Sequence, residues 1–265
     1  MEIITSLKNE KIKNIEALLK LKKERDRQGL FVMEGQRIFK DTLETAPEFI
    51  HSIFVSESFS KETDPEVYQE KLKSFKSDCK IFVLKDNVFN GISQTVTPQG
   101  ILCIVRKPEY DLGSILSQSK VKLLLLENIQ DPGNLGTMLR TAEAAGMSGI
   151  IMSRGCADIF SPKVVRSTMG SVFRMPFIYS EDFYQSLNEI RERDISIYAA
   201  YLHGGSDYRE VEFGERSAIM IGNEGNGLTE DAVEKADHRV FIPMKGKIES
   251  LNAAVAAAIL MYHCR

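Results

Sequence analysis

The chain has 265 residues, of which 43% are hydrophobic and 27% are charged, and its formal net charge is -3. This length is enough for two domains or for one large α/β domain, and the composition is typical of a globular protein in solution. No stretch approaches the roughly 18 apolar residues of a membrane span, and no basic and apolar secretory signal is visible at the start. These features argue against a membrane protein and lead us to expect a cytoplasmic one.

The cysteines and histidines are scattered along the chain. The cysteines show neither C-x-x-C nor metal-ligand spacing, which favours buried, reduced thiols. Isolated histidines are usually structural or surface residues, so we assign none to a metal and expect no metal cofactor. The four cysteines are Cys79, Cys103, Cys156 and Cys264, and the four histidines are His51, His203, His238 and His263.

The first 40 residues are basic in a chain that is acidic overall. They contain ten lysines and arginines against six acidic residues, a local charge of +4. Such a patch can bind phosphates. Alternatively, Ile12, Ile15, Leu18 and Leu19 form the core stripe of an amphipathic helix whose solvent-facing side happens to be basic. Charge alone favours this second interpretation.

The first half alternates strand and helix patterns, as in a small α/β domain over residues 1–108. After the basic helix we expect a helix from the Glu34-Gly35 step to the residue before Pro47, and another over residues 65–75. The polar segment 109–120 has the character of a linker with room for one helical turn. Strands are expected at Leu30–Met33, Phe49–Val55, Ile81–Leu84 and Ile101–Val105.

The second half, residues 121–265, repeats the alternation more strongly. Strand runs such as Lys-Leu-Leu-Leu-Leu are apolar on both faces, which predicts a parallel sheet covered by helices on either side. Ligands of such sheets bind at the carboxyl ends of the strands. Expected strands are Val121–Leu126, Gly149–Ser153, Ile195–Tyr201, Ser217–Ile221 and Arg239–Ile242, and expected helices are Asn134–Ala145, Pro162–Gly170 and Asp182–Arg193.

Two glycine-rich turns follow strands of this half, at Asp131–Gly136 and Gly222–Gly227. The second reads G-x-x-G-x-G rather than G-x-G-x-x-G, and no G-x-x-x-x-G-K-[ST] occurs. The sequence therefore disfavours both a Rossmann dinucleotide site and a P-loop. Each turn on its own has the ordinary composition of a surface turn.

A third segment, Ile242 to His263, reads IPMKGKIESLNAAVAAAILMYH. Ser250 is the expected N-cap of a terminal helix, and the alanines that follow permit close packing against another backbone. A well-capped helix in a core or a dimer interface explains the alanines. It does not explain Glu249 and Asn252 beside the cap.

Taken in order, the three segments resemble the motifs of the SpoU, or TrmH-type, branch of the SPOUT RNA methyltransferases. The matching stretches are ENIQDPGNLGTMLRTAEAAG, IMIGNEGNGL and IPMKGKIESLNAAVAAA. The opening stretch, TSLKNEKIKNIEALLKLKKERDRQGLFVMEGQRI, is similar to the substrate-binding domain of the same family. The resemblance covers nearly the whole chain.

The resemblance implies an α/β fold whose C-terminal parallel-sheet SPOUT domain contains a deep trefoil knot, binds S-adenosylmethionine and forms a homodimer. It also implies a small N-terminal α/β domain, similar to ribosomal protein L30e, that grips structured RNA. RNA binding then becomes the favoured role of the basic start of the chain. The residues that we expect to contact RNA are Lys11, Lys13, Lys22, Lys23, Arg25, Arg27, Glu34 and Arg37.

The implied reaction transfers the sulfonium methyl group to a ribose 2′-hydroxyl. This hydroxyl is a weak acid, so orientation and help in losing its proton should dominate catalysis. A guanidinium is seldom neutral, so Arg140 is expected to fix the target phosphate and stabilise negative charge, and to act as base only if its pKa is lowered. An ion pair with Glu143 is the alternative for Arg140.

By match to the motifs, Glu224 is expected to offset the sulfonium charge or to hold Arg140, and Asn252 to hydrogen-bond the ribose or the cofactor. The expected catalytic residues are Asn134, Arg140, Glu224, Ser250 and Asn252. The residues expected to bind S-adenosylmethionine are Leu202, Gly222, Asn223, Gly227, Ile242, Met244 and Leu251.

Two other functions stay open at this point. One is a cofactor-free RNA-binding protein that uses the SPOUT-like half only to dimerise, and the other is methylation of a base by the same fold. Ribose methylation of ribosomal RNA, most of all the 23S molecule, is the favoured interpretation.

Overall fold

A computed structural model describes residues 2–63, 67–68 and 79–264. The chain forms two compact units: an N-terminal unit of Met1–Pro108 and Phe160–Phe173, and a C-terminal unit of Glu109–Ile159 and Arg174–Arg265. The short segment 160–173, which the sequence placed in the second domain, thus joins the first unit. The helix expected over 65–75 falls on residues outside those described, 67 and 68 excepted. No helix among the described residues is both long enough and apolar enough to cross a membrane.

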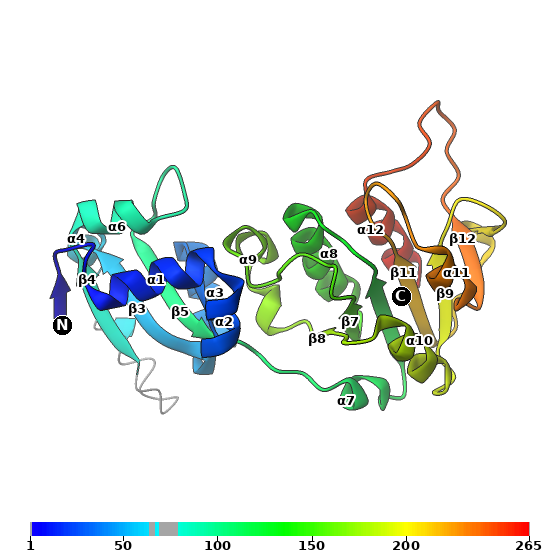
Figure 1. Cartoon of the computed structure of the whole chain (residues 1–265), viewed down its shortest axis with the longest axis horizontal. Helices are drawn as coiled ribbons and strands as arrows, with labels where there is room; N and C mark the ends of the chain where they lie inside the picture. The colour runs from blue at the N-terminus through cyan, green and yellow to red at the C-terminus, as the bar shows by residue number, and fades with distance from the viewer. Residues whose placement is uncertain (1, 64–66, 69–78, 265) are drawn as a thin grey trace. The chain divides into compact units, whose positions relative to one another are not determined.

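In the described residues, the N-terminal unit is built on a mixed sheet of five strands in the order β1-β4-β3-β5-β2 (Figure 1). Strands β1, β4 and β3 run parallel to one another, and β5 is antiparallel to both β3 and β2. The strands are β1 (Glu2–Ile4), β2 (Leu30–Glu34), β3 (Ile50–Ser56), β4 (Lys80–Leu84) and β5 (Ile101–Arg106). The helices are α1 (Glu10–Lys20), α2 (Lys22–Gln28), α3 (Gln36–Thr45), η1 (Pro47–Phe49), α4 (Glu57–Glu62), α6 (Asp86–Ile92), α9 (Pro162–Thr168) and η2 (Ser171–Phe173).

Helix α1 carries the apolar stripe that the sequence predicted. Its four stripe residues are all buried, which confirms the core role of this face. The Asn9 side chain begins the helix by accepting a hydrogen bond from the Lys11 amide at 2.9 Å. The basic side chains lie on the remaining faces because the apolar stripe occupies the side that packs on the sheet.

The C-terminal unit contains, within its described residues, a sheet of seven parallel strands in the order β10-β12-β9-β11-β6-β7-β8 (Figure 1). This confirms the predicted parallel sheet. The strands are β6 (Val121–Leu126), β7 (Gly149–Met152), β8 (Phe177–Tyr179), β9 (Ser196–Ala200), β10 (Ser206–Asp207), β11 (Arg216–Ile221) and β12 (His238–Phe241). The helices are α7 (Leu112–Leu116), α8 (Pro132–Ala145), α10 (Phe183–Arg191), η3 (Tyr208–Glu210), α11 (Glu230–Glu234) and α12 (Ala253–Cys264).

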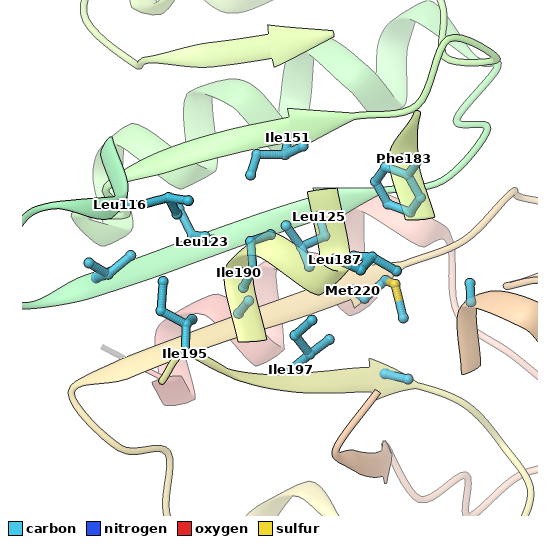
Figure 2. Packing of buried hydrophobic residues seen from close by; sticks show 14 of the residues in the cluster. Leu116, Leu123, Leu125, Ile151, Phe183, Leu187, Ile190, Ile195, Ile197 and Met220 are labelled. Carbon is cyan, nitrogen blue, oxygen red and sulfur yellow. The ribbon is translucent and has the colours of Figure 1, made fainter. Parts of the chain in front are cut away.

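Strand β6 is buried on both of its faces, as its unbroken leucine run predicts. Leu123 and Leu125 point to the face covered by α10, where Leu187 packs against the sheet (Figure 2). Leu124 and Leu126 alternate to the opposite face and have no exposed surface either. Burial of one such side chain contributes about 1.5–3 kcal/mol, so this central strand anchors the sheet.

The cysteines behave as expected from their spacing. All four lie in the described part of the chain, and all are free and buried. Burial raises the pKa of the Cys79 thiol to about 12 and that of Cys103 well above its usual value. Thiols of this kind are protonated and inert at neutral pH.

Candidate active site

The site begins where β6 ends and α8 starts. Asp131 is the N-cap of α8, and its Oδ1 accepts a hydrogen bond from the Asn134 amide at 2.8 Å. Pro132 occupies the first turn, where its missing N–H costs nothing. The predicted helix therefore starts at Pro132, two residues before the expected position, and it places Asn134 at the carboxyl edge of the sheet.

The second wall of the site is the tight loop that follows β11. The Asn223 amide donates to the Gly227 carbonyl at 3.0 Å, and the Gly227 amide donates back at 2.9 Å. The Asn223 side-chain oxygen accepts hydrogen bonds from the amides of Gly225 and Asn226 at 3.0 and 3.1 Å. A side chain at Gly222 would approach the Gly227 carbonyl carbon to 2.2 Å, so this position requires glycine.

Glu224 ties this loop to the start of α8. Its Oε1 accepts hydrogen bonds from the Asp131 amide and from Asn134 Nδ2, both at 3.0 Å, and its Oε2 accepts one from the Gln130 amide at 3.1 Å. Asn252 Nδ2 in turn donates to Asn134 Oδ1 at 2.9 Å. One residue from each of the three sequence motifs thus joins a single hydrogen-bonded chain, Glu224–Asn134–Asn252.

The surroundings of Glu224 keep it ionised. Partial burial alone would raise the pKa of its carboxyl group, but the hydrogen bonds from Asn134 and from the amides of Asp131 and Gln130 outweigh it and lower the pKa. Glu224 is therefore a negatively charged acceptor at neutral pH. It cannot serve as a general acid, but it can orient Asn134 and attract positive charge.

Two further residues of the first motif, which the sequence analysis did not single out, hold the same loop. Glu127 is 2% exposed and accepts hydrogen bonds from the Thr229 amide and hydroxyl, both at 2.8 Å, and from the Tyr184 hydroxyl at 3.0 Å. The Asn128 carbonyl accepts one from Asn223 Nδ2 at 2.8 Å. The sequence feature that indicates the role of Glu127 is its position directly after an apolar strand, because a charged residue that is buried there must have hydrogen-bond partners.

A cavity of 750 Å³ lies between this loop, the residues after β9, and the segment that leads into α12. Its size falls within the usual range for small-molecule sites. Glu224 and Ser250 line it, whereas Asn134, Arg140 and Asn252 do not. It brings together all the residues expected to bind the cofactor, namely Leu202, Gly222, Asn223, Gly227, Ile242, Met244 and Leu251.

Arg140 lies on α8 and is exposed. It makes no hydrogen bond or ion pair with any residue that the structure describes. The alternative ion pair with Glu143 is not formed, because Glu143 Oε2 accepts from Arg174 Nη2 at 3.2 Å. Nor does Glu224 hold Arg140, since its oxygens are bonded to the start of α8. The Arg140 guanidinium is thus free to meet a ligand.

Ser250 is not the N-cap of the last helix, contrary to the sequence prediction. Helix α12 begins at Ala253, and the cap is Asn252, whose Oδ1 accepts from the amides of Ala254 and Val255 at 2.9 and 3.2 Å. A capping side chain must reach the second or third amide of the helix, and Ser250 lies too far upstream. Within the described chain Ser250 is exposed and makes no hydrogen bond.

Two of the residues expected to contact RNA are buried instead. Arg25 is 4% exposed, and its Nη1 donates to the Leu18 carbonyl at 2.6 Å at the end of α1. Glu34 is 7% exposed and accepts hydrogen bonds from the Gln94 amide and the Thr95 hydroxyl, both at 2.9 Å. Both side chains hold the fold together in this structure.

The other six expected RNA contacts are partly or fully exposed. Three of them form surface ion pairs: Lys11 with Glu2, Lys13 with Glu10 and Arg27 with Glu24, at 2.9, 2.9 and 2.7 Å. Exposed pairs of this kind contribute little to stability and can exchange for a phosphate. The six residues are Lys11, Lys13, Lys22, Lys23, Arg27 and Arg37.

A parallel α/β unit whose three motifs meet at the carboxyl ends of the strands, beside a cavity of cofactor size, is typical of an enzyme domain that binds a small-molecule cofactor. The model of the SpoU rRNA Methylase family matches residues 122–262, and that of the MRM3-like substrate binding domain matches residues 9–103. The chain belongs to the SpoU rRNA methylase family. It is accordingly an RNA methyltransferase whose cofactor is S-adenosylmethionine.

Relatives extend over the full chain. The 23S rRNA (guanosine(2553)-2'-O)-methyltransferase RlmP of Bacillus subtilis is 35% identical over 265 residues, which is 100% of both chains. An uncharacterized tRNA/rRNA methyltransferase of Synechocystis is 30% identical and covers 99% of this chain and 93% of that one. The AdoMet-bound rRNA methyltransferase of Sinorhizobium meliloti superposes with a TM-score of 0.85 at 30% identity, covering 100% and 97% of the two chains.

A second solved structure with bound cofactor agrees. The SpoU methyltransferase AviRb of Streptomyces viridochromogenes in complex with AdoMet gives a TM-score of 0.84 at 25% identity, with 97% of each chain covered. The predicted fold class, an α/β chain with a SPOUT domain after a smaller α/β domain, is confirmed.

Proposed function

We propose that this protein transfers the methyl group of S-adenosylmethionine to a ribose 2′-hydroxyl of 23S ribosomal RNA. The observation that carries the proposal is the hydrogen-bonded chain Glu224–Asn134–Asn252 at the edge of the 750 Å³ cavity. The full-length similarity to the Bacillus subtilis enzyme supports 23S RNA as the substrate. The guanosine named for that enzyme, at position 2553, is the first candidate target.

The residues of the cavity fit this cofactor. Ile242, Met244 and Leu251 offer an apolar wall for a purine, and the glycine loop lets backbone amides approach a ligand closely. The ionised Glu224 carboxylate provides the negative charge that a sulfonium requires. When bound, S-adenosylmethionine supplies an electrophilic methyl group.

Asn134 is the residue that we assign to the ribose hydroxyl. A side-chain amide has two N–H donors and an oxygen with two lone pairs. Glu224 takes one donor of Asn134 and Asn252 takes one lone pair, so one of each is left for a hydroxyl group. Because Glu224 and Asn252 hold the amide from both sides, Asn134 would orient the hydroxyl without reorganising.

Arg140 supplies positive charge near the reacting oxygen. It binds the phosphate of the target nucleotide and stabilises the negative charge that develops on the 2′-oxygen. The hydroxyl proton then leaves to solvent.

The homodimer, the trefoil knot and the cytoplasmic location stay predictions. Val255 and Tyr262, 48% and 45% exposed, are seven residues apart on α12 and so lie on one side of the helix. Such exposed apolar side chains support a helix that packs against a second copy. Light scattering of the purified protein would test this.

The proposal is tested by transfer of isotopically labelled methyl to an unmodified 23S RNA transcript, with nucleoside mass spectrometry to locate the label. We expect label on a ribose with the wild-type protein and a loss of at least about a hundredfold in rate for Arg140→Ala, in line with the removal of one charge-stabilising group. Arg193→Ala, at the amino end of β9, is the matched control and should keep the wild-type rate.

Each contrary result has a clear meaning. Wild-type rate in Arg140→Ala would refute the role of that arginine. Label on a base would establish the base-methylation alternative. No calorimetric binding of S-adenosylmethionine would favour the RNA-binding protein that only dimerises through this fold.

A further inference from the structure

Most basic side chains of the C-terminal unit are engaged by neighbouring groups. Lys122 Nζ donates to the Gly214 carbonyl at 2.7 Å, and Arg191 Nε donates to Asp237 at 3.0 Å. Lys245 and Lys247 differ. Both are exposed, and neither makes a hydrogen bond or ion pair with any residue among those the structure describes. Two full positive charges are therefore available to an external anion.

These lysines lie beside the active-site cavity. They belong to the segment 243–250 between β12 and α12, which Figure 1 shows as a long loop projecting away from the sheet. Met244 before them and Glu249 after them both line the cavity. Ile248, next to Lys247, is 61% exposed, so the loop also offers an apolar side chain to solvent. The loop thus forms the outer rim of the cavity.

The charge of the cavity itself is unfavourable for an RNA substrate. Three carboxylates, Glu224, Glu230 and Glu249, line the cavity and would repel an approaching phosphate backbone. Arg140 is an unpaired cation on α8, and α8 packs against α12, the helix that the loop enters. Lys245 and Lys247, in the loop that leads into α12, add a second group of unpaired cations.

We propose that Lys245 and Lys247 bind phosphates of the RNA strand that carries the target nucleotide. The catalytic unit then holds the RNA directly, in addition to any contact made by the N-terminal domain. This inference rests on the proposed function, since it assumes an RNA substrate. A lysine ammonium is a mobile point charge, so these contacts supply affinity and orientation and do not read the base sequence.

The test compares two double variants with the same loss of charge. Lys245→Gln/Lys247→Gln removes the rim cations, and Lys120→Gln/Arg193→Gln removes two cations that precede β6 and β9, at the amino ends of the strands. Binding of a fluorescent 23S RNA fragment around the candidate guanosine is measured by anisotropy at several salt concentrations. Each lost phosphate contact reduces the slope of log K against log salt by about 0.7–0.9.

We expect the rim variant to lower this slope by about 1.4–1.8 and to raise the KM for RNA several-fold, with the loss falling on KM rather than on kcat. Its dissociation constant for S-adenosylmethionine should match that of the wild type. The control variant should keep the wild-type slope. Lys245→Arg/Lys247→Arg should restore RNA binding because it keeps both charges.

An unchanged slope in the rim variant would overturn the inference. So would weaker binding of S-adenosylmethionine with normal RNA binding, because the loop would then serve the cofactor. The binding measurement needs no methyl transfer. A wild-type protein that binds RNA with this salt dependence but transfers no methyl group would refute the proposed function and leave the rim contacts standing.

Discussion

Replacing Gly222 by alanine should force open the loop that follows β11. The added Cβ would lie 2.2 Å from the Gly227 carbonyl carbon and from the Leu228 nitrogen. Non-bonded carbon atoms prefer separations of about 3.5–4.0 Å, so the backbone would have to move by about 1 Å or more. That movement breaks the paired hydrogen bonds between Asn223 and Gly227, at 3.0 and 2.9 Å.

The size of the effect follows from these contacts. Two backbone hydrogen bonds contribute about 1 kcal/mol each, and an overpacked site costs about 1–3 kcal/mol. We therefore expect Gly222→Ala to lower the free energy of unfolding by about 3–5 kcal/mol, a large part of the 5–15 kcal/mol typical of a protein domain. The affinity for S-adenosylmethionine should fall as well, because the loop lines the cavity.

Two glycines of the same loop are matched controls. An alanine at Gly225 would place its Cβ 3.6 Å from the nearest atom, an ordinary contact, so its cost should stay below about 0.5 kcal/mol. Gly227 has open space around it but a φ of +69°, which makes alanine unfavourable by about 1–2 kcal/mol. In urea unfolding, Gly222→Ala should be the least stable variant, Gly227→Ala intermediate and Gly225→Ala the most stable. Equal midpoints for Gly222→Ala and Gly225→Ala would refute the reasoning.

Three further outcomes can be checked by unfolding experiments. Asn252→Ala should lower the free energy of unfolding by about 1 kcal/mol through loss of the helix cap, whereas Ser250→Ala should stay within about 0.5 kcal/mol; the reverse order would restore Ser250 as the cap. Glu127→Ala should cost about 2–4 kcal/mol because the buried Thr229 amide and hydroxyl lose their acceptor, and a cost below 1 kcal/mol would contradict this. The lowered pKa of Glu224 means that its stabilising effect is complete above the ordinary value of 4.5 and is lost as the pH falls through the folded value. The stability difference between wild type and Glu224→Gln should thus be constant from neutral pH down to about pH 6 and shrink below 4.5, and a difference that grows in acid would count against it.

Much of the architecture was predictable because periodicity records burial directly. The apolar stripe of α1 predicts a helix with one buried face. The run of β6, which is apolar on both faces, predicts a central parallel strand. Parallel strands also bring their carboxyl ends to one edge, so three distant motifs had to meet there. The short strands β8 and β10 were not predicted. Strand β8 has only three residues and β10 has only two, both polar, so neither shows a periodic pattern.

Side-chain partners were harder to predict than elements. Arg25 stands in a polar stretch and Glu34 ends the apolar strand β2. Only the tertiary structure shows that Arg25 hydrogen-bonds to the Leu18 carbonyl and Glu34 to the Gln94 amide. The N-cap residue of α12 depends on the position at which the chain turns from the cavity lining into the helix. The local sequence pattern does not indicate that position. Charged groups are buried when partners exist, and those partners come from distant parts of the sequence.

The hydrogen-bonded chain through Asn134 also has a consequence for folding. It joins residues 90 and 118 positions apart in sequence, to Glu224 and to Asn252. Contacts this distant carry a large loop-closure entropy and form slowly, after the local helices and neighbouring strands are in place. We expect the site to assemble among the last events of folding. Partly folded chains would then have no activity, and the recovery of cofactor binding would report when the native state is complete.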